Sequence, residues 1–172
     1  MSTNGATKTA SLYTQQGKKG TNQDAMLVWE NFNSRSDTVF CGVFDGHGPV
    51  GHTVAKKVRD TLPFIVCSQW NDEQSGKPPH ATEKSPPGTP SSDDDGDDEA
   101  YQSLDAEEGN EKLPEMCMPL KKSILKAFNL MDKELKLHPT IDCFCSGTTA
   151  VTLIKQACTL FLQYPIVFIV SV

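Results

Sequence analysis

Two short apolar runs near the N-terminus predict a pair of β-strands. Residues 25–30 and 38–44 are rich in β-branched, aromatic and other apolar side chains, and the segment between them, 31–37, is polar and turn-prone. We therefore expect an antiparallel pair with its turn at 31–37. In such a pair the start of the first strand and the end of the second lie at one edge. Asp24 and Asp45 are then neighbours.

Apolar residues at helical spacing predict two helices. The first follows a glycine-rich turn, and Pro63 is expected to kink or end it. Its apolar positions are Val54, Val58, Leu62 and Ile65, and Lys56, Lys57 and Arg59 fall on its other face. The second helix has a longer apolar stripe, with lysines largely off it, and Pro139 marks its end. That stripe consists of Leu120, Ile124, Phe128, Met131 and Leu135.

One more strand is predicted in the C-terminal part of the chain, and the residues after it are much more apolar. Residues 146–154 are small and β-branched, which is typical of a central strand. Residues 157–172 are strongly apolar but short for a membrane span, and Gln163 and Pro165 interrupt them. Three interpretations stay open for this tail: an interfacial segment, a strand, or an unnatural end produced by altered splicing, which we favour.

Charge is distributed unevenly over the 172 residues. Residues 71–115 carry 14 acidic and 3 basic side chains, whereas the whole chain has 22 and 16. This segment is also rich in proline and poor in apolar residues, so little burial offsets the entropy of ordering it. We expect a disordered acidic insert in a mildly basic core. An acidic docking segment or a metal buffer are the alternatives.

Cysteine usage and the N-terminus indicate the cell compartment. The six cysteines form no C-x-x-C pair, which favours reduced, structural thiols. The first residues contain no apolar signal stretch and no glycine at position 2 for myristoylation. A cytoplasmic or nuclear protein is expected.

The residues that suggest chemistry lie at the shared strand edge. A cation, Lys19, and an acid, Asp24, precede the first strand, and the second strand runs into Asp45, Gly46 and His47. Two carboxylates and a lysine at one edge predict a site for a metal ion and a phosphate. Taken singly, each residue has a simpler explanation, because Asp-Gly is a common turn dipeptide and an exposed lysine is usually only solvated.

Three segments carry a resemblance to a known family. Residues 17–25 (GKKGTNQDA), 43–48 (VFDGHG) and 146–150 (SGTTA) resemble successive N-terminal motifs of the metal-dependent protein serine/threonine phosphatases of type 2C, in a form typical of plants. The match covers residues 16–156, interrupted by the insert. It implies an α+β fold, an incomplete α/β/β/α two-sheet sandwich. The implied organisation is a flexible N-terminus (1–15), phosphatase segments (16–70 and 116–156), the acidic insert (71–115) and a divergent apolar tail (157–172).

The resemblance also implies roles for single residues. In this family a pair of Mg²⁺ or Mn²⁺ ions activates the water that attacks phosphorus. By position, Asp45 bridges both ions, Gly46 contributes its backbone carbonyl, and His47 takes the place of the general acid. Asp24 matches the acid that orients metal-bound water or completes the second metal site.

Two positions depart from the family pattern. Gln23 stands where many members have glutamate, so one direct carboxylate ligand is expected to be missing or replaced by water. Lys19 stands where many members have a phosphate-binding arginine. Lysine supplies the charge without the bidentate fork, so we expect it to bind phosphate less strictly.

The family's further metal-binding aspartates have no match after residue 156, so the chain looks like the first half of a phosphatase. The expected function is Mg²⁺- or Mn²⁺-dependent dephosphorylation of phosphoserine and phosphothreonine proteins by a monomer, with no nucleic-acid or membrane partner. The alternative is a catalytically silent truncated isoform that acts as a binding or competing fragment. A membrane-tethered fragment is a third, less favoured interpretation.

Overall fold

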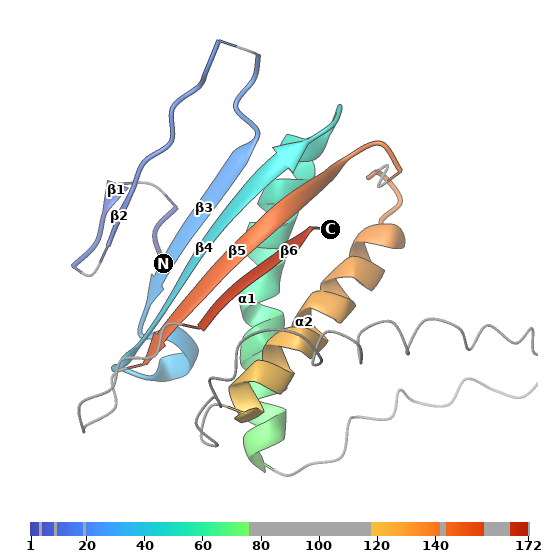
Figure 1. Cartoon of the computed structure of the whole chain (residues 1–172). Helices are drawn as coiled ribbons and strands as arrows, with labels where there is room; N and C mark the ends of the chain where they lie inside the picture. The colour runs from blue at the N-terminus through green and yellow to red at the C-terminus, as the bar shows by residue number, and fades with distance from the viewer. Residues whose placement is uncertain are drawn as a thin grey trace, which may run out of the picture.

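The computed structural model describes residues 1–3, 5–8, 10–18, 20–75, 118–141, 144–156 and 166–171 (Figure 1). Most of the predicted acidic insert lies outside the described residues. The elements are, in chain order, β1 (Gly5–Ala6), β2 (Ser11–Leu12), β3 (Asp24–Glu30), the 3₁₀ helix η1 (Phe32–Ser34), β4 (Thr38–His47), α1 (Gly51–Ser75), α2 (Met118–Lys136), β5 (Gly147–Gln156) and β6 (Ile166–Ser171).

The main sheet is antiparallel, with the strand order β3-β4-β5-β6. The predicted strand pair is confirmed, because β3 and β4 are joined by a turn containing η1, and Asp24 is the register partner of Asp45. The predicted central strand is confirmed too, since β5 lies between β4 and β6. Within the apolar tail, residues 166–171 form a strand, one of the three interpretations left open. The splicing interpretation stays a prediction.

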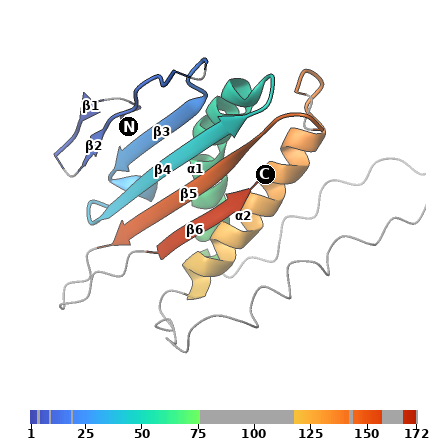
Figure 2. The ribbon, with the colours of Figure 1, turned by 45° about the horizontal axis from the view of Figure 1, so that its top comes forward.

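One face of this sheet is covered by helix α1, which contacts β3, β4 and β5 (Figure 2). Side chains alternate along the strands, so Phe40, Phe44, Ala150 and Ile154 are buried on the helix side. Helix α2 packs against α1, and all five residues of its predicted stripe are buried in the same core. The α+β class is therefore confirmed.

The other face of the sheet is open over β4 and β5 in the part of the chain that the structure describes. Val43 is 46% exposed and Val151, its register partner, is 36% exposed. We call this surface the open face. Apolar side chains with no cover are unusual in a sheet, which is normally buried on at least one face and polar on the other.

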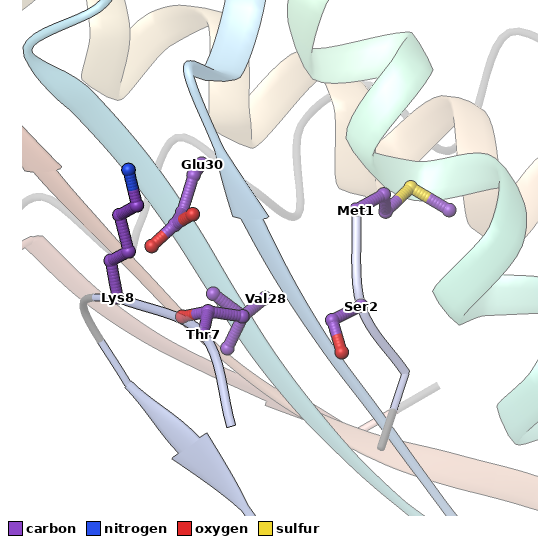
Figure 3. A pocket seen from close by; sticks show the side chains of 6 residues that line it. All are labelled: Met1, Ser2, Thr7, Lys8, Val28 and Glu30. Carbon is purple, nitrogen blue, oxygen red and sulfur yellow. The ribbon is translucent and has the colours of Figure 1, made fainter. Parts of the chain in front are cut away.

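Near β3 the N-terminal segment shapes a separate hollow of about 500 Å³ (Figure 3). Ser2 pairs with Val28 through two backbone hydrogen bonds of 2.8 Å, which extends the edge of the sheet. The hollow is lined by Met1, Ser2, Thr7, Lys8, Val28 and Glu30. It lies toward the end of β3 away from Asp24, so it is distinct from the predicted site.

Pro63 does not end helix α1, which continues to Ser75. The reason lies in tertiary contacts that the local sequence does not reveal. Trp70 is 3% exposed and stacks on Phe32 with ring centroids 6.4 Å apart, while the Arg35 guanidinium lies 4.6 Å from the centre of the Trp70 ring. These contacts offset the backbone hydrogen bond that proline removes. Residues 71–75, assigned above to the insert, are the last residues of this helix.

We predict that Trp70→Ala destabilises the protein by about 3–5 kcal/mol, because it opens a cavity between η1 and α1. Phe64→Ala is the matched control, since Phe64 lies on the same helix but is 54% exposed. Its cost is expected to be about 1 kcal/mol. Urea unfolding followed by circular dichroism measures both. Equal losses for the two variants would contradict this account of α1.

The described cysteines differ in burial. Cys41, Cys67 and Cys145 are free thiols, and Cys145 is exposed. Burial raises the pKa of the Cys67 thiol from its ordinary value near 9 to about 11, against a weaker opposing effect of the Asn33 backbone. Burial also raises the pKa of Cys41. These two half-buried thiols are therefore held neutral, as expected of structural cysteines.

From this difference we predict that iodoacetamide modifies Cys145 at least about tenfold faster than Cys67 at pH 8. Since Cys67 ionises near pH 9 when unfolded and near 11 when folded, its contribution to stability is full below pH 9 and is lost as pH rises toward 11. Peptide mass mapping measures the labelling order. Faster labelling of Cys67 than of Cys145 would contradict the prediction.

Candidate functional site

The two predicted acids lie side by side at one end of the open face. Asp24 is the first residue of β3 and pairs in register with Asp45 of β4, which in turn pairs with Thr149 of β5. Both carboxylates are exposed. His47 is also exposed and, being two residues after Asp45, belongs to the same face. The edge therefore presents two acids and a histidine to solvent.

Asp24 is oriented by a short hydrogen-bond network. The Thr14 hydroxyl donates to Asp24 Oδ2 at 2.9 Å, and Asn22 Nδ2 donates to Thr14 Oγ1 at 2.8 Å. The Asp24 backbone N–H donates to Asn22 Oδ1 at 3.0 Å. Thr14 and Asn22 are not among the residues predicted from the sequence. An Asn two residues before the acid is a signal for the last of these bonds, since Asn side chains often accept from the backbone two residues on.

The turn after Asp45 is packed so closely that only glycine fits. A Cβ at Gly46 would lie 2.4 Å from the Gly51 carbonyl oxygen and 2.7 Å from that of Gln23. Gly48 has φ of +84°, a left-handed conformation that favours glycine. These two glycines let the chain pass from the end of β4 directly into helix α1.

The third sequence motif meets the other two at this turn. Ser146 precedes β5 and is 5% exposed, and its Oγ accepts a hydrogen bond of 3.0 Å from the Val50 N–H. A Cβ at Gly48 would lie 2.1 Å from the Cys145 carbonyl oxygen. All three motifs, although the first and the third are separated by 120 residues in the chain, therefore converge on the start of α1.

Gln23 is engaged with helix α1. Its Oε1 accepts a hydrogen bond of 2.9 Å from the His52 N–H, in the first turn of the helix. Helix N-termini leave their first N–H groups without intrahelical partners, and a side-chain oxygen that accepts from one of them stabilises the helix. Gln23, which stands where many family members have glutamate, thus accepts a hydrogen bond from the backbone of α1.

The fit to a metal pair is partial in the described residues. Carboxylate oxygens suit Mg²⁺ and Mn²⁺, and the register brings two of them together. Across the described ranges, no group of three or more His, Cys, Asp and Glu residues is arranged to hold a metal ion. Lys19 lies outside the described residues. The roles of Asp45, Gly46, Asp24, His47 and Lys19 stay predictions.

Comparison with known proteins decides the family. A rice (Oryza sativa subsp. japonica) protein named Probable protein phosphatase 2C 66 is 59% identical over 155 residues, which cover 89% of this chain and 28% of the relative. An Arabidopsis thaliana protein named Probable protein phosphatase 2C 6 is 60% identical over 154 residues, which cover 89% of this chain and 30% of the relative. The chain belongs to the protein phosphatase 2C family and matches part of the length of its relatives.

The resemblance seen in the three motifs is thereby confirmed. Another Arabidopsis relative, named Probable protein phosphatase 2C 18, is 56% identical over 170 residues, which cover 34% of its length. The chain spans about 30% of the length of the curated phosphatase 2C relatives it matches. No family model matches the chain. Where the structure describes the chain, its helices lack the combination of length and apolar character needed to cross a membrane.

The close packing at Gly46 leads to a prediction. Gly46→Ala is expected to destabilise the protein by about 1–3 kcal/mol, because its Cβ would overlap two backbone oxygens. Gly17→Ala is the control, since a Cβ there has no atom within 4 Å, and its effect is expected to stay within about 0.5 kcal/mol. Thermal unfolding compares the two. A neutral Gly46→Ala would contradict the observed contact between β4 and α1.

Proposed function

We propose that this chain supplies one wall of the two-metal site of a Mg²⁺- or Mn²⁺-dependent protein serine/threonine phosphatase. The observation that carries the proposal is the register pairing of Asp24 with Asp45 at the exposed end of the open face. Its support from outside the structure is the high identity to plant proteins named as protein phosphatases 2C. The proposed substrates are proteins that carry phosphoserine or phosphothreonine.

The chemistry of these residues suits phosphate-ester hydrolysis. Bound divalent ions supply Lewis acidity and an activated water, and they neutralise the charge of the phosphoryl group. Asp45 and the Gly46 carbonyl are the proposed ligands on β4, and Asp24 is the proposed ligand or orienting acid on β3. The Thr14 hydroxyl restrains the Asp24 carboxylate, which reduces the reorganisation needed when a cation binds.

His47 is the proposed general acid. His47 lies on the same face as Asp45, and a positioned imidazole can donate a proton to the departing seryl or threonyl oxygen. Its exposure leaves room for a protein substrate. Lys19 is the proposed phosphate-binding residue, because its side chain carries a charge opposite to that of the phosphoryl group.

The open face supports the finer fold assignment. Polar residues occupy the row Asp24, Asp45 and Thr149, and in the next row on β4 and β5 the apolar Val43 and Val151 are exposed. Burial of such apolar rows stabilises a fold by about 25 cal/mol per Å². We therefore assign the open face as the inner surface of the two-sheet sandwich, where a second sheet brings further metal ligands to the acids.

One observation favours a second candidate function, a catalytically silent form that binds partners or competes with an active phosphatase. The described residues gather only two of the carboxylates that a metal pair needs, and they form no larger metal-binding group. In this second proposal the chain keeps the acids of β3 and β4 but lacks turnover.

We predict that the 172-residue chain binds Mn²⁺ weakly and that Asp45→Asn and Asp24→Asn each reduce the affinity by about tenfold or more, because each removes one of two converging charges. Asp60→Asn is the control, since Asp60 is an exposed acid on α1 that pairs with Arg59. Isothermal titration calorimetry measures the affinities. Unchanged Mn²⁺ affinity in Asp45→Asn would refute the assigned role.

Turnover tests whether this chain carries a complete site. With Mn²⁺ and a phosphothreonine peptide, phosphate release by the chain is expected to stay near background, because two carboxylates alone do not position a metal pair. Robust Mn²⁺-dependent release that Asp45→Asn abolishes would show a complete site in this chain and overturn the proposal that it supplies only one wall of the site.

A further inference from the structure

We propose that Gln23 is a positioning residue for this site: its side chain holds the first turn of α1 against the ends of β3 and β4, and so fixes the spacing of Asp24 and Asp45. The inference rests on the proposed function for the meaning of that spacing. The contacts of Gln23 with α1 and β4 are observed independently of that function.

Gln23 contacts both neighbouring elements at once. Its Oε1 accepts the 2.9 Å hydrogen bond from the His52 N–H of α1, and its own carbonyl oxygen lies where a Cβ of Gly46 would come within 2.7 Å. One residue thus meets the start of the helix through its side chain and the end of β4 through its main chain.

The gap that Gln23 fills has no room for other side chains. A Cβ at Gly51 would lie 2.5 Å from Gln23 Oε1 and 2.8 Å from the Gly46 carbonyl carbon. Gly46 and Gly51 are both buried. Gln23, Gly46 and Gly51 therefore form a three-way contact, which we call the glycine clamp, in which two backbones and one amide group touch directly.

The clamp is adjacent in the chain to both acids. Gln23 immediately precedes Asp24, and Gly46 immediately follows Asp45. Neighbouring residues of a strand project to opposite faces, so the carboxylates on the open face are backed on the helix side by the clamp. A change in the distance between Gln23 and α1 consequently shifts the backbone that carries each acid.

A substitution at Gln23 can distinguish a residue that positions the backbone from one that holds the place of a metal ligand. If Gln23 held the place of a missing metal ligand, Gln23→Glu would restore a carboxylate and add metal-binding capacity. In the clamp, a glutamate keeps the acceptor for the His52 N–H, and its charge is favourable at the positive end of a helix. Gln23→Glu is therefore expected to preserve the structure and leave the number of bound Mn²⁺ ions unchanged.

The test compares Gln23→Glu and Gln23→Met in the 172-residue chain, using NMR hydrogen exchange and chemical shifts of the backbone amides. Gln23→Met keeps the side-chain length but removes the acceptor, so the His52 amide is expected to exchange about tenfold faster. The amide signals of Asp45 and Gly46 should shift as well. Gln23→Glu should restore all three signals. Gln16→Met should leave them unchanged, since Gln16 is exposed and its side chain bonds only to the Gly20 carbonyl among the contacts described.

Mn²⁺ titration of the same variants gives the second readout. Weaker Mn²⁺ binding in Gln23→Met and wild-type binding in Gln23→Glu are expected. An additional Mn²⁺ ion in Gln23→Glu would overturn the proposal in favour of ligation. A change at His52 with no change at Asp45 and Gly46 would also overturn it, because Gln23 would then be only a helix cap.

Two further outcomes keep the test decisive. If Gln23→Met does not fold, Gln23→Asn serves instead, since it keeps the amide but is one methylene too short to reach His52, and the same signals decide. If the wild-type chain binds no Mn²⁺, the proposed function fails. The amide signals of Asp45 and Gly46 then still show whether Gln23 sets the position of the strand ends.

Discussion

The contact between the Gly46 and Gly51 backbones is the constraint on which the rest of the structure depends. No side chain fits at either position, because the backbone at the end of β4 lies directly against the backbone at the start of α1. That approach brings the buried face of the sheet against the helix and leaves Asp45 on the opposite face. Ser146, just before β5, and Gln23, just before β3, each accept a hydrogen bond from the start of α1. A fixed turn of this kind gives an acid a defined position before any ligand arrives.

Much of this arrangement follows from the chain's apolar pattern. The apolar, β-prone runs 25–30 and 38–44, with one polar turn between them, are sufficient to predict the antiparallel pair and a shared edge for Asp24 and Asp45, which the observed register confirms. The stripe of α2 is equally plain, since five apolar residues recur at helical spacing and all are buried.

Other features depend on partners distant in sequence, which local pattern does not reveal. The continuation of α1 past Pro63 depends on Trp70 meeting Phe32 and Arg35, residues of a turn more than 30 positions earlier. The hydrogen bond between Gln23 and His52 joins positions 29 residues apart, and that from Thr14 joins a loop to Asp24, the first residue of β3. The family resemblance drew attention to Gln23 as a departure, but only the three-dimensional contact shows what the side chain does.

Helix α1 separates two regions of very different chemistry. Its 25 residues correspond to a rod of about 37 Å, with the glycine clamp at one end and, at the other, Asn33 and Asn71 exchanging two hydrogen bonds of 2.9 and 3.1 Å. The acidic segment departs from that far end. Its length and charge can therefore vary during evolution without disturbing the acids at the near end, since added residues enter the chain a full helix length away from them.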